Sequence, residues 1–322
     1  MTRQDSVRTS RLPEGGLGRI RQHLRHLGNL ETNQGVLATL LILPSVVITL
    51  GLILWPLLST FALSFANSNL ARPERQQFVG LQNYLDFFSD RFFWETVGRT
   101  AYFTIVSVGV ELVLGIGIAL LIGARPRGWR FLRTAIIIPW AVPTIVNGAI
   151  WRWIFNADYG ALNGLLLQLG LIQRYVPWLT DPTSAMNVVI FADIWHSFPF
   201  VVLIISAALA TLPTELYEAA GIDGASAWQR FTRITLPLLR PAIMVVLVVR
   251  TVEAFRVFDI IYMMTHAGPV NGTMVISFQA YEETFRYLRI GSGSALSFIV
   301  SLFIGVLALI YVRLLYTEDT TG

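Results

Sequence analysis

Long apolar segments constrain the fold of this chain more than any other feature of its sequence. Six of them are apolar enough to cross a bilayer, and each reaches the roughly 20 residues that an α-helical span needs. They cover residues 36–65, 101–122, 134–153, 187–211, 241–264 and 294–316. Because backbone amides in lipid must be hydrogen-bonded within their own segment, the sequence predicts an all-α, polytopic integral membrane protein with six transmembrane helices.

The composition agrees with a membrane location and excludes several kinds of chemistry. The chain is 54% apolar and 14% charged, which leaves too little polar surface for an ordinary soluble domain. It contains no Cys and no Lys, since all 24 basic residues are Arg. A Walker A phosphate loop needs a Lys. We therefore expect no cofactor in this chain, and any ATP and Mg²⁺ that drive it to bind to partner chains.

The remaining side chains form no recognisable catalytic or metal-binding set. The four His residues are scattered along the sequence, and neither a zinc-binding His-Glu-x-x-His nor a nucleophile motif is present. Arg residues are spread over loops instead of being gathered on one face, which is not typical of a nucleic-acid-binding protein. We therefore predict no catalytic residues, no metal site and no nucleic-acid partner.

The distribution of Arg predicts the orientation in the membrane, because cytoplasmic loops carry an excess of positive charge. Fourteen Arg residues fall on the side of the N-terminal tail and eight on the opposite side. Both termini are therefore predicted to be cytoplasmic. The predicted organisation is a tail over residues 1–35, a six-span domain over 36–316 in contact with membrane lipid, and a tail over 317–322.

A charged loop over residues 212–240, between the fourth and fifth spans, carries the most distinctive motif of the chain. It is too polar to lie in lipid and too short to build a core, yet it holds large apolar side chains. These are Leu216, Ile222, Trp228 and Phe231. Exposed apolar patches mark interaction sites, and the Arg distribution places this loop in the cytoplasm. A cytoplasmic protein partner is therefore expected.

Several positions of this loop resemble the signature loop of binding-protein-dependent ABC importer permeases. The matching residues are Glu218, Ala219, Ala220, Asp223, Gly224, Ile234, Leu236 and Pro237. Gly224 is expected to turn the chain between two short helices at positive φ. Pro237 and Pro241 are expected to end the loop helix and to set the start of the fifth span.

Other segments resemble the permeases of carbohydrate importers, in particular the first permease subunit of the trehalose/maltose type. They are Phe78-Val79-Gly80-Leu81-Gln82-Asn83-Tyr84, Ile138-Pro139-Trp140, Trp151-Arg152-Trp153, and Phe258-Asp259-Ile260-Ile261-Tyr262 running into Gly268-Pro269. The resemblance extends from about residue 40 to the C-terminus. The chain departs from the enterobacterial maltose permease, because it lacks two extra N-terminal spans and a large outer domain.

This resemblance implies the type I permease fold of ABC importers and a subunit that is not itself an enzyme. It implies import of a sugar such as trehalose or maltose across a bacterial plasma membrane, with ATP hydrolysed by an ATPase homodimer docked on the signature loop. A second permease subunit and an extracellular or periplasmic sugar-binding protein are the other implied partners. Two alternatives stay open: the same architecture importing glycerol phosphate, an oligosaccharide or another polar solute, and a secondary transporter.

Charged residues in the fifth span mark a candidate substrate pathway, because charges in lipid are costly and face a cavity or a partner. Arg250, Glu253, Arg256 and Asp259 follow one another at intervals of three with alternating sign. One interpretation is that they form ion pairs along the helix. The other is that this face lines the sugar pathway, as the corresponding helix does in the resembling maltose permease. The candidates on this helix are Arg250, Glu253, Ala254, Arg256 and Val257.

The third and fourth spans add side chains that suit a sugar, which is bound by hydrogen bonds and by an aromatic face. His196, Ser197 and Phe200 in the fourth span offer both kinds of contact, and Asn147 in the third span is a similar candidate. A structural hydrogen bond between helices is the alternative for His196. Glu111 in the second span is expected to be neutralised by a neighbouring helix of either subunit.

Two segments on the predicted outer side are interpreted as interfacial, with contact to a delivery protein as the alternative. The first is an aromatic belt made of Phe87, Phe88, Phe92, Phe93 and Trp94. The second is a short helix at the outer surface within residues 156–186.

Overall fold

A computed structural model describes residues 34–124 and 128–315. The predicted tail over 317–322, most of the tail over 1–35, and Arg125 and Arg127 lie outside these described residues. The described part is helical except for connecting segments and one small sheet, which confirms the all-α prediction. In that sheet β1 (Ala66–Asn67) pairs antiparallel with β2 (Gln77–Phe78), with Ala66 opposite Phe78. The chain divides into two compact units, Met1–Thr60 and Phe61–Gly322, which are described separately.

The first unit is a long apolar helix. It comprises α2 (Gln34–Thr49), a π-helical turn (Leu50–Leu54) and most of α3 (Trp55–Ser64). Pro44 lies inside α2, and Pro56 lies just after the π-helical turn. The π-helical turn therefore lies in the part of the helix where Pro interrupts the backbone hydrogen bonds. Ala38–Ser64 is long and apolar enough to cross a membrane, and its side chains are largely exposed, as lipid-facing side chains are.

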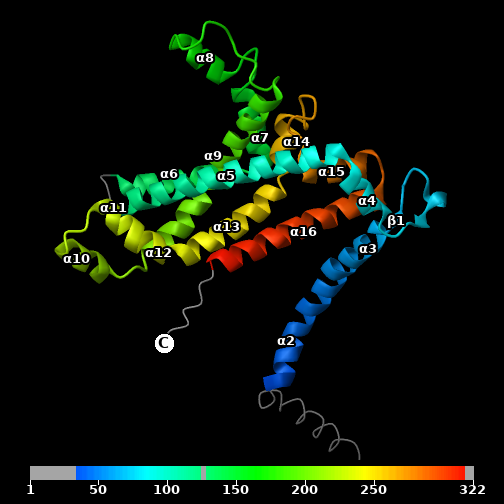
Figure 1. Ribbon diagram of the computed structural model, residues 1–322, viewed down its shortest axis with the longest axis horizontal. Coiled ribbons are helices and arrows are strands. Elements are labelled where there is room, and N and C mark those ends of the chain that lie inside the picture. The colour runs from blue at the N-terminus through cyan, green and yellow to red at the C-terminus, as the bar shows by residue number, and fades with distance from the viewer. Residues whose placement is uncertain (1–33, 125–127, 316–322) are drawn as a thin grey trace, which may run out of the picture. The chain divides into compact units, whose positions relative to one another are not determined.

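Four long helices form the bundle of the second unit (Figure 1). They are α5 (Arg91–Gly123), α9 (Pro182–Leu209), α13 (Arg240–Phe255) and α16 (Ile290–Leu315). α5 lies along α9 and α13, and α16 packs on α13. Gly115 allows the close approach of α5 to α9, since a Cβ there would lie 2.3 Å from Cγ1 of Val201. α5 begins at Arg91, earlier than the predicted residue 101, because Asp90 caps it by accepting from the Phe92 N–H.

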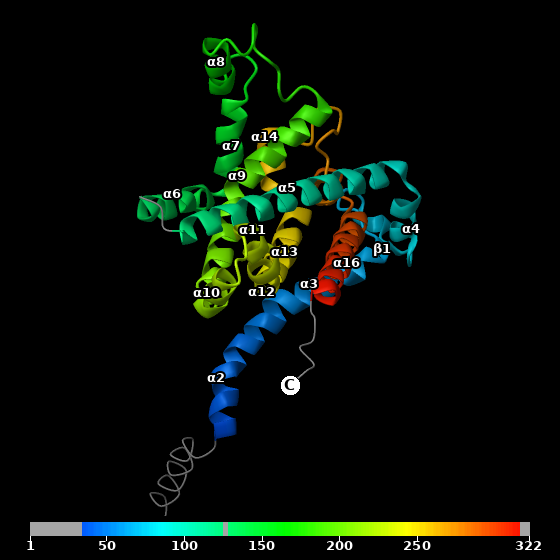
Figure 2. The same cartoon turned by 60° about the vertical axis from the view of Figure 1, so that its left-hand side comes forward.

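The predicted third span is a bent pair of helices. α6 (Trp129–Ala141) and α7 (Thr144–Ile154) meet at 96°. Pro143 explains the break, because a Pro has no N–H to donate and holds the preceding residue, Val142, in an extended conformation. From this bend α7 runs side by side with α14 (Asp259–Met264), as two views show (Figure 1 and Figure 2).

The predicted fifth span is also interrupted, because α13 ends at Phe255 and α14 starts four residues later, at Asp259. Four described helices are long and apolar enough to cross a membrane, and the predicted six is reached if each of two bent pairs counts as one span. The second pair joins helical residues 227–238 to α13 at 64°.

Further short elements of the second unit lie outside residues 212–240. They are a 3₁₀ turn (Pro73–Arg75), α4 (Gln82–Ser89), α8 (Ala161–Gln168), α15 (Ile276–Tyr281) and a π-helical turn (Glu282–Arg286). α8 is the short helix predicted within residues 156–186. The prediction of an aromatic belt is wrong for Phe87 and Phe93, which are buried in a core cluster with Phe255 and Leu296; Phe88 and Trp94 are exposed.

Candidate functional site

A cavity of about 370 Å³ lies among α6, α7, α9, α13 and the break that follows α13. The sequence candidates in its lining are Asn147, His196, Ser197, Phe200, Arg250, Glu253, Arg256 and Val257. Ala254 alone among the pathway candidates is absent from the lining, because its side chain is buried in the apolar core. The lining residues that were not selected as candidates are Trp140, Thr144, Asp193, Phe258, Asp259 and Ile260.

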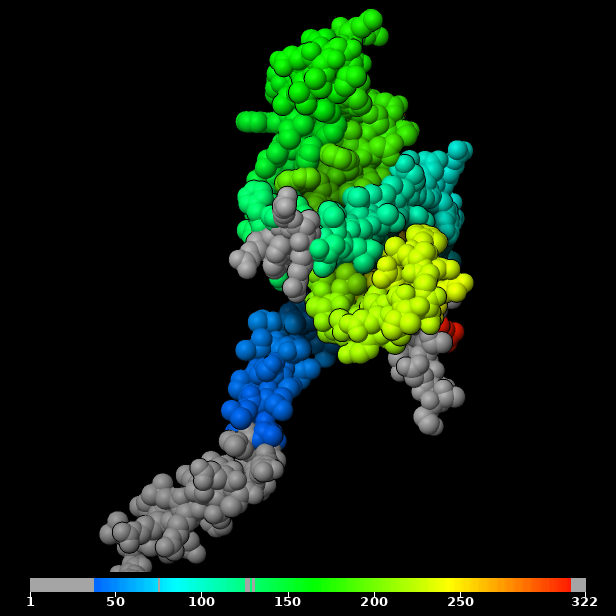
Figure 3. Space-filling view, turned by 90° about the vertical axis from the view of Figure 1, so that its left-hand side faces the viewer, coloured from blue at the N-terminus to red at the C-terminus, as the bar shows by residue number. Residues whose placement is uncertain are grey.

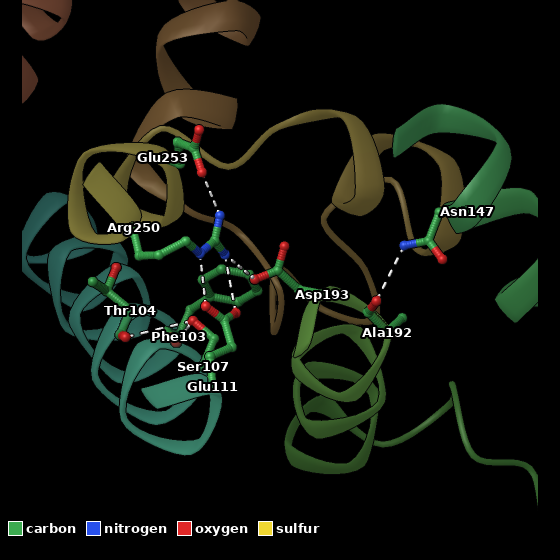
Figure 4. A network of polar contacts seen from close by, with 9 residues as sticks. All are labelled: Phe103, Thr104, Ser107, Glu111, Asn147, Ala192, Asp193, Arg250 and Glu253. Carbon is green, nitrogen blue, oxygen red and sulfur yellow. Dashed lines mark hydrogen bonds and ion pairs between the residues drawn. The ribbon is translucent and has the colours of Figure 1, made fainter. Parts of the chain in front are cut away.

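Arg250 organises a network of charges beside this cavity (Figure 4). Its Nε and Nη2 donate to the two carboxylate oxygens of Glu111 at 2.7 and 3.0 Å, which is a bidentate pairing. Nη2 also donates to Oδ2 of Asp193 at 3.3 Å, and Nη1 to Oε2 of Glu253 at 2.5 Å. Glu111 is fully buried, whereas the Glu253 side chain is 56% exposed. Arg250 therefore ties α13 to α5 and to α9.

The network tests whether the charges in the fifth span form ion pairs along one helix or line a cavity. Arg250 and Glu253 do pair along α13, but its end at Phe255 removes Arg256 and Asp259 from the same helix. The expectation that all four charges pair along one helix is therefore wrong. Asp259 instead accepts from Oγ1 of Thr144 at 2.7 Å.

Glu111 is neutralised by a neighbouring helix, as expected, and that helix belongs to the same chain. Asp193 also belongs to this group, although it was not among the candidates selected from the sequence. Residue type alone could have identified Asp193, because a carboxylate within an apolar span is rare and points to a cavity or an ion pair.

His196 and Asn147 both make structural hydrogen bonds at the cavity wall. Nδ1 of His196 lies 3.0 Å from the carbonyl oxygen of Pro139, which links α9 to α6 and agrees with the structural alternative. Nδ2 of Asn147 donates to the carbonyl oxygen of Ala192 at 3.1 Å. Oδ1 of Asn147 is buried and has no hydrogen-bond partner in the described structure. Asn147 therefore holds one unsatisfied acceptor beside the cavity.

Aromatic side chains complete the cavity. The rings of Trp140 and Phe200 lie 6.5 Å apart between centroids, and Phe258 adds a third ring. Hydrogen-bonding groups beside aromatic faces suit a solute that is rich in hydroxyl groups and has an apolar ring face.

The docking segment, residues 212–240, lies at the end of the bundle where α5 terminates (Figure 1). It contains α10 (Thr214–Ile222), α11 (Ala227–Arg230), a π-helical turn (Phe231–Thr235) and α12 (Leu236–Leu238). Gly224 has a φ of 74°, so that the expected turn at positive φ is confirmed. Ser226 and Gln229 then form a capping box that starts α11.

The docking segment lies at the surface of the second unit (Figure 3), and several of its large apolar side chains are exposed. Ile222 is 89% exposed and Trp228 is 70% exposed, and Leu216 is exposed as well. Phe231 is half-buried against Trp228, with ring centroids 5.6 Å apart. Among the signature residues, Glu218, Ala219, Asp223 and Gly224 are exposed, and Ala220, Ile234, Leu236 and Pro237 are half-buried.

The expectation that Pro237 ends the loop helix is wrong. Pro237 lies in the first turn of α12, where its missing N–H is tolerated, and the bend falls two residues later, at the fully buried Leu239. Pro241 lies in the first turn of α13, as expected for a residue that sets the start of that helix.

Comparison with known proteins identifies this arrangement. Residues 112–317 match the family described as binding-protein-dependent transport system inner membrane component. The chain belongs to this family. Its members are membrane components of transporters and not enzymes, and the apolar helices agree with a multi-pass membrane protein.

The permease is similar to curated proteins over most of its length. It is 40% identical to the trehalose/maltose transport system permease protein MalF of Thermococcus litoralis over 88% of this chain and 95% of that protein. It is 35% identical to the sulfoquinovosyl glycerol transport system permease protein SmoG of Agrobacterium fabrum, over 90% and 94%. The trehalose transport system permease protein SugA of Mycobacterium tuberculosis is also 35% identical, over 86% and 88%.

A solved structure supports the fold. The permease aligns with a chain of a bacterial ABC transporter involved in the import of the acidic polysaccharide alginate, with a TM-score of 0.76. The alignment covers 90% of the permease and 98% of that chain, at 23% sequence identity. The likeness shows that the permease has the fold of an ABC importer permease.

Proposed function

We propose that this chain is the permease subunit of an ATP-driven importer for an uncharged sugar, with a disaccharide such as trehalose or maltose as the substrate class. The observation that carries the proposal is the cavity at the break after α13, where polar and aromatic side chains from five helices meet. The trehalose/maltose relatives at 35–40% identity agree with it. Family membership favours an ATP-driven importer over a secondary transporter, which would carry its own coupling-ion site.

The charges of the cavity favour an uncharged solute over an anionic one. Carboxylates of Asp193, Glu253 and Asp259 line the cavity, and the guanidinium of Arg250 is already shared among carboxylates. Arg256 is the remaining cation in this lining. A glycerol phosphate or an acidic saccharide would therefore meet net negative charge, which repels anions. A neutral sugar instead finds carboxylate acceptors for its hydroxyl groups.

The proposed partner proteins follow from two features of the chain: it has no Lys, and its docking segment exposes apolar side chains. With no Lys for a phosphate loop, the permease depends on an ATPase homodimer that binds ATP and Mg²⁺. The exposed apolar side chains of the docking segment are the proposed contact with that ATPase, together with Glu218 and the other signature residues. We place the docking segment and both termini in the cytoplasm, with a second permease subunit beside the chain and a sugar-binding protein outside.

Uptake by the reconstituted complex tests this function. Proteoliposomes with both permeases, the ATPase and the binding protein should take up labelled trehalose or maltose when ATP is supplied, and should not take up labelled glycerol phosphate. Glu253→Gln should reduce sugar uptake by about tenfold, because it weakens a charged hydrogen bond to the solute. Its matched control is Glu95→Gln, on α5 and outside the cavity lining. Preferential uptake of glycerol phosphate, or uptake without ATP, would contradict the proposal.

A further inference from the structure

A second recess, here called the outer recess, is lined by residues of α4, α15 and the π-helical turn before α16. These elements lie at the opposite end of the bundle from the docking segment (Figure 1). The outer recess measures about 510 Å³ and is also bounded by the start of α5. Four carboxylates line it, those of Asp86, Asp90, Glu282 and Glu283. The guanidinium in this lining is that of Arg289. The outer recess is therefore acidic.

The carboxylates of the outer recess differ in how far the chain itself satisfies them. Asp90 accepts from the Phe92 N–H at 2.9 Å, and Asp86 accepts from Nε2 of Gln82 at 2.6 Å. Glu282 pairs with Arg286 at 2.5 Å. Glu283 makes a longer ion pair, with Oε2 3.6 Å from Nη1 of Arg289, and this distance is too long for a hydrogen bond.

Two buried oxygen atoms of the lining have no hydrogen-bond partner in the described structure. They are Oε2 of Glu283 and Oε1 of Gln279, and the Gln279 residue is only 6% exposed. Buried polar atoms are nearly always hydrogen-bonded in folded proteins. Both atoms are acceptors, so the missing group is a donor. The surrounding carboxylates favour a donor that is positively charged, as an ammonium or a guanidinium is.

A metal ion does not meet this requirement. Within the described residues no three His, Asp or Glu side chains are placed to share one metal ion. The apolar walls provided by Phe87, Phe92 and Met274 fit a different occupant. Lys and Arg carry their charge at the tip of an apolar stem, which packs on such walls while the tip reaches the carboxylates.

We propose that the outer recess receives a Lys or Arg side chain of the extracellular binding protein when that protein docks. This inference rests on the proposed function, which places the docking segment in the cytoplasm and hence the opposite end of the bundle outside. The family is binding-protein-dependent, so a protein partner reaches this end. Charge complementarity then selects a basic side chain over a neutral or acidic one.

The affinity of the sugar-loaded binding protein for the assembled transporter tests the inference. In nanodiscs that hold both permeases and the ATPase, Glu283→Gln should weaken binding by about tenfold or more and flatten its dependence on ionic strength. Gln279→Met, which removes the other acceptor while keeping the length of the side chain, should weaken binding too. The matched control is Glu74→Gln, an exposed carboxylate outside the recess, which should bind as the wild type does.

Two results would overturn the assignment of the outer recess, and a third would contradict only the proposed function. Wild-type affinity and salt dependence in Glu283→Gln would overturn the inference. Loss of the second permease from the purified Glu283→Gln complex would also overturn it, because the recess would then be a contact between subunits. Normal docking without sugar uptake in the wild type would contradict the proposed function and leave the recess assignment standing.

Discussion

Three carboxylates surround the guanidinium of Arg250, but their environments differ. Glu111 is fully buried and bidentate, and Asp193 is mostly buried, whereas Glu253 reaches into the cavity. Buried ion pairs gain little net stability when complete, yet removing one partner leaves an uncompensated charge. The pair with Glu111 therefore serves the fold of the permease, and Glu253 is the member that remains available to a solute.

Arg250→Met should sharply reduce the amount of folded permease. It leaves the carboxylates of Glu111 and Asp193 buried without their counter-charge, a loss of about 3–5 kcal/mol in the free energy of unfolding. Size-exclusion chromatography of a fluorescent fusion measures the folded fraction. Arg256→Met is the matched control, since Arg256 is exposed and lies outside this network. Equal folded fractions for both variants would show that the network is dispensable for folding.

At the scale of the elements, the closest helix contact described above is that of α5 with α9. Gly115→Ala places a methyl group 2.3 Å from Cγ1 of Val201, well inside the sum of the two van der Waals radii, so that the helices must separate. We expect a loss of about 1–3 kcal/mol, seen as a lower midpoint of thermal unfolding in detergent. Gly117→Ala, with no atom within 4 Å of its added Cβ, should unfold at the wild-type temperature or above it. A wild-type midpoint for Gly115→Ala would contradict this packing.

The turn of the docking segment makes a second prediction at this scale. Gly224 adopts a φ of 74°, which Pro cannot reach. Gly224→Pro should therefore abolish sugar uptake and uncouple the ATPase while the chain still enters the membrane, as measured by ATP hydrolysis in proteoliposomes. Gly221→Ala is the control, because Gly221 lies in α10 and its added Cβ meets no atom. Coupled transport by Gly224→Pro would exclude the segment as the coupling element.

At the scale of the whole molecule, hydropathy and local motifs predict much of the fold. The long apolar runs predict α5, α9 and α16, and the Gly at residue 224 predicts the turn between α10 and α11. Other features depend on contacts between distant residues. Glu111 and Arg250 are 139 positions apart, and no local pattern pairs them. The break after Phe255 has no Pro or Gly in Arg256-Val257-Phe258, so that only tertiary packing against neighbouring helices places it.

In the candidate site, too, some residues could be predicted from local sequence and others depend on contacts between distant segments. Six of the cavity residues are polar or charged candidates, and such side chains are uncommon in spans. Phe200 was selected for its aromatic face, and Val257 from the resemblance to the maltose permease. Thr144 and Asp259 were not selected, since their contact exists only after the bends on either side bring α7 and α14 together. By residue type alone, Trp140, Phe258 and Ile260 do not differ from lipid-facing residues.

The central claim, that sugar passes through the cavity at the break after α13, is tested most directly by thiol labelling. The chain has no Cys, so labelling of the permease by a thiol reagent can occur only at the introduced Cys. Thr144→Cys places it in the cavity lining, and Thr183→Cys, at the exposed start of α9, is the control outside that lining. In the actively transporting complex, saturating sugar should slow labelling of the thiol at residue 144 by a water-soluble reagent and leave labelling at residue 183 unchanged. Equal labelling rates at residue 144 with and without sugar, while uptake continues, would contradict the claim.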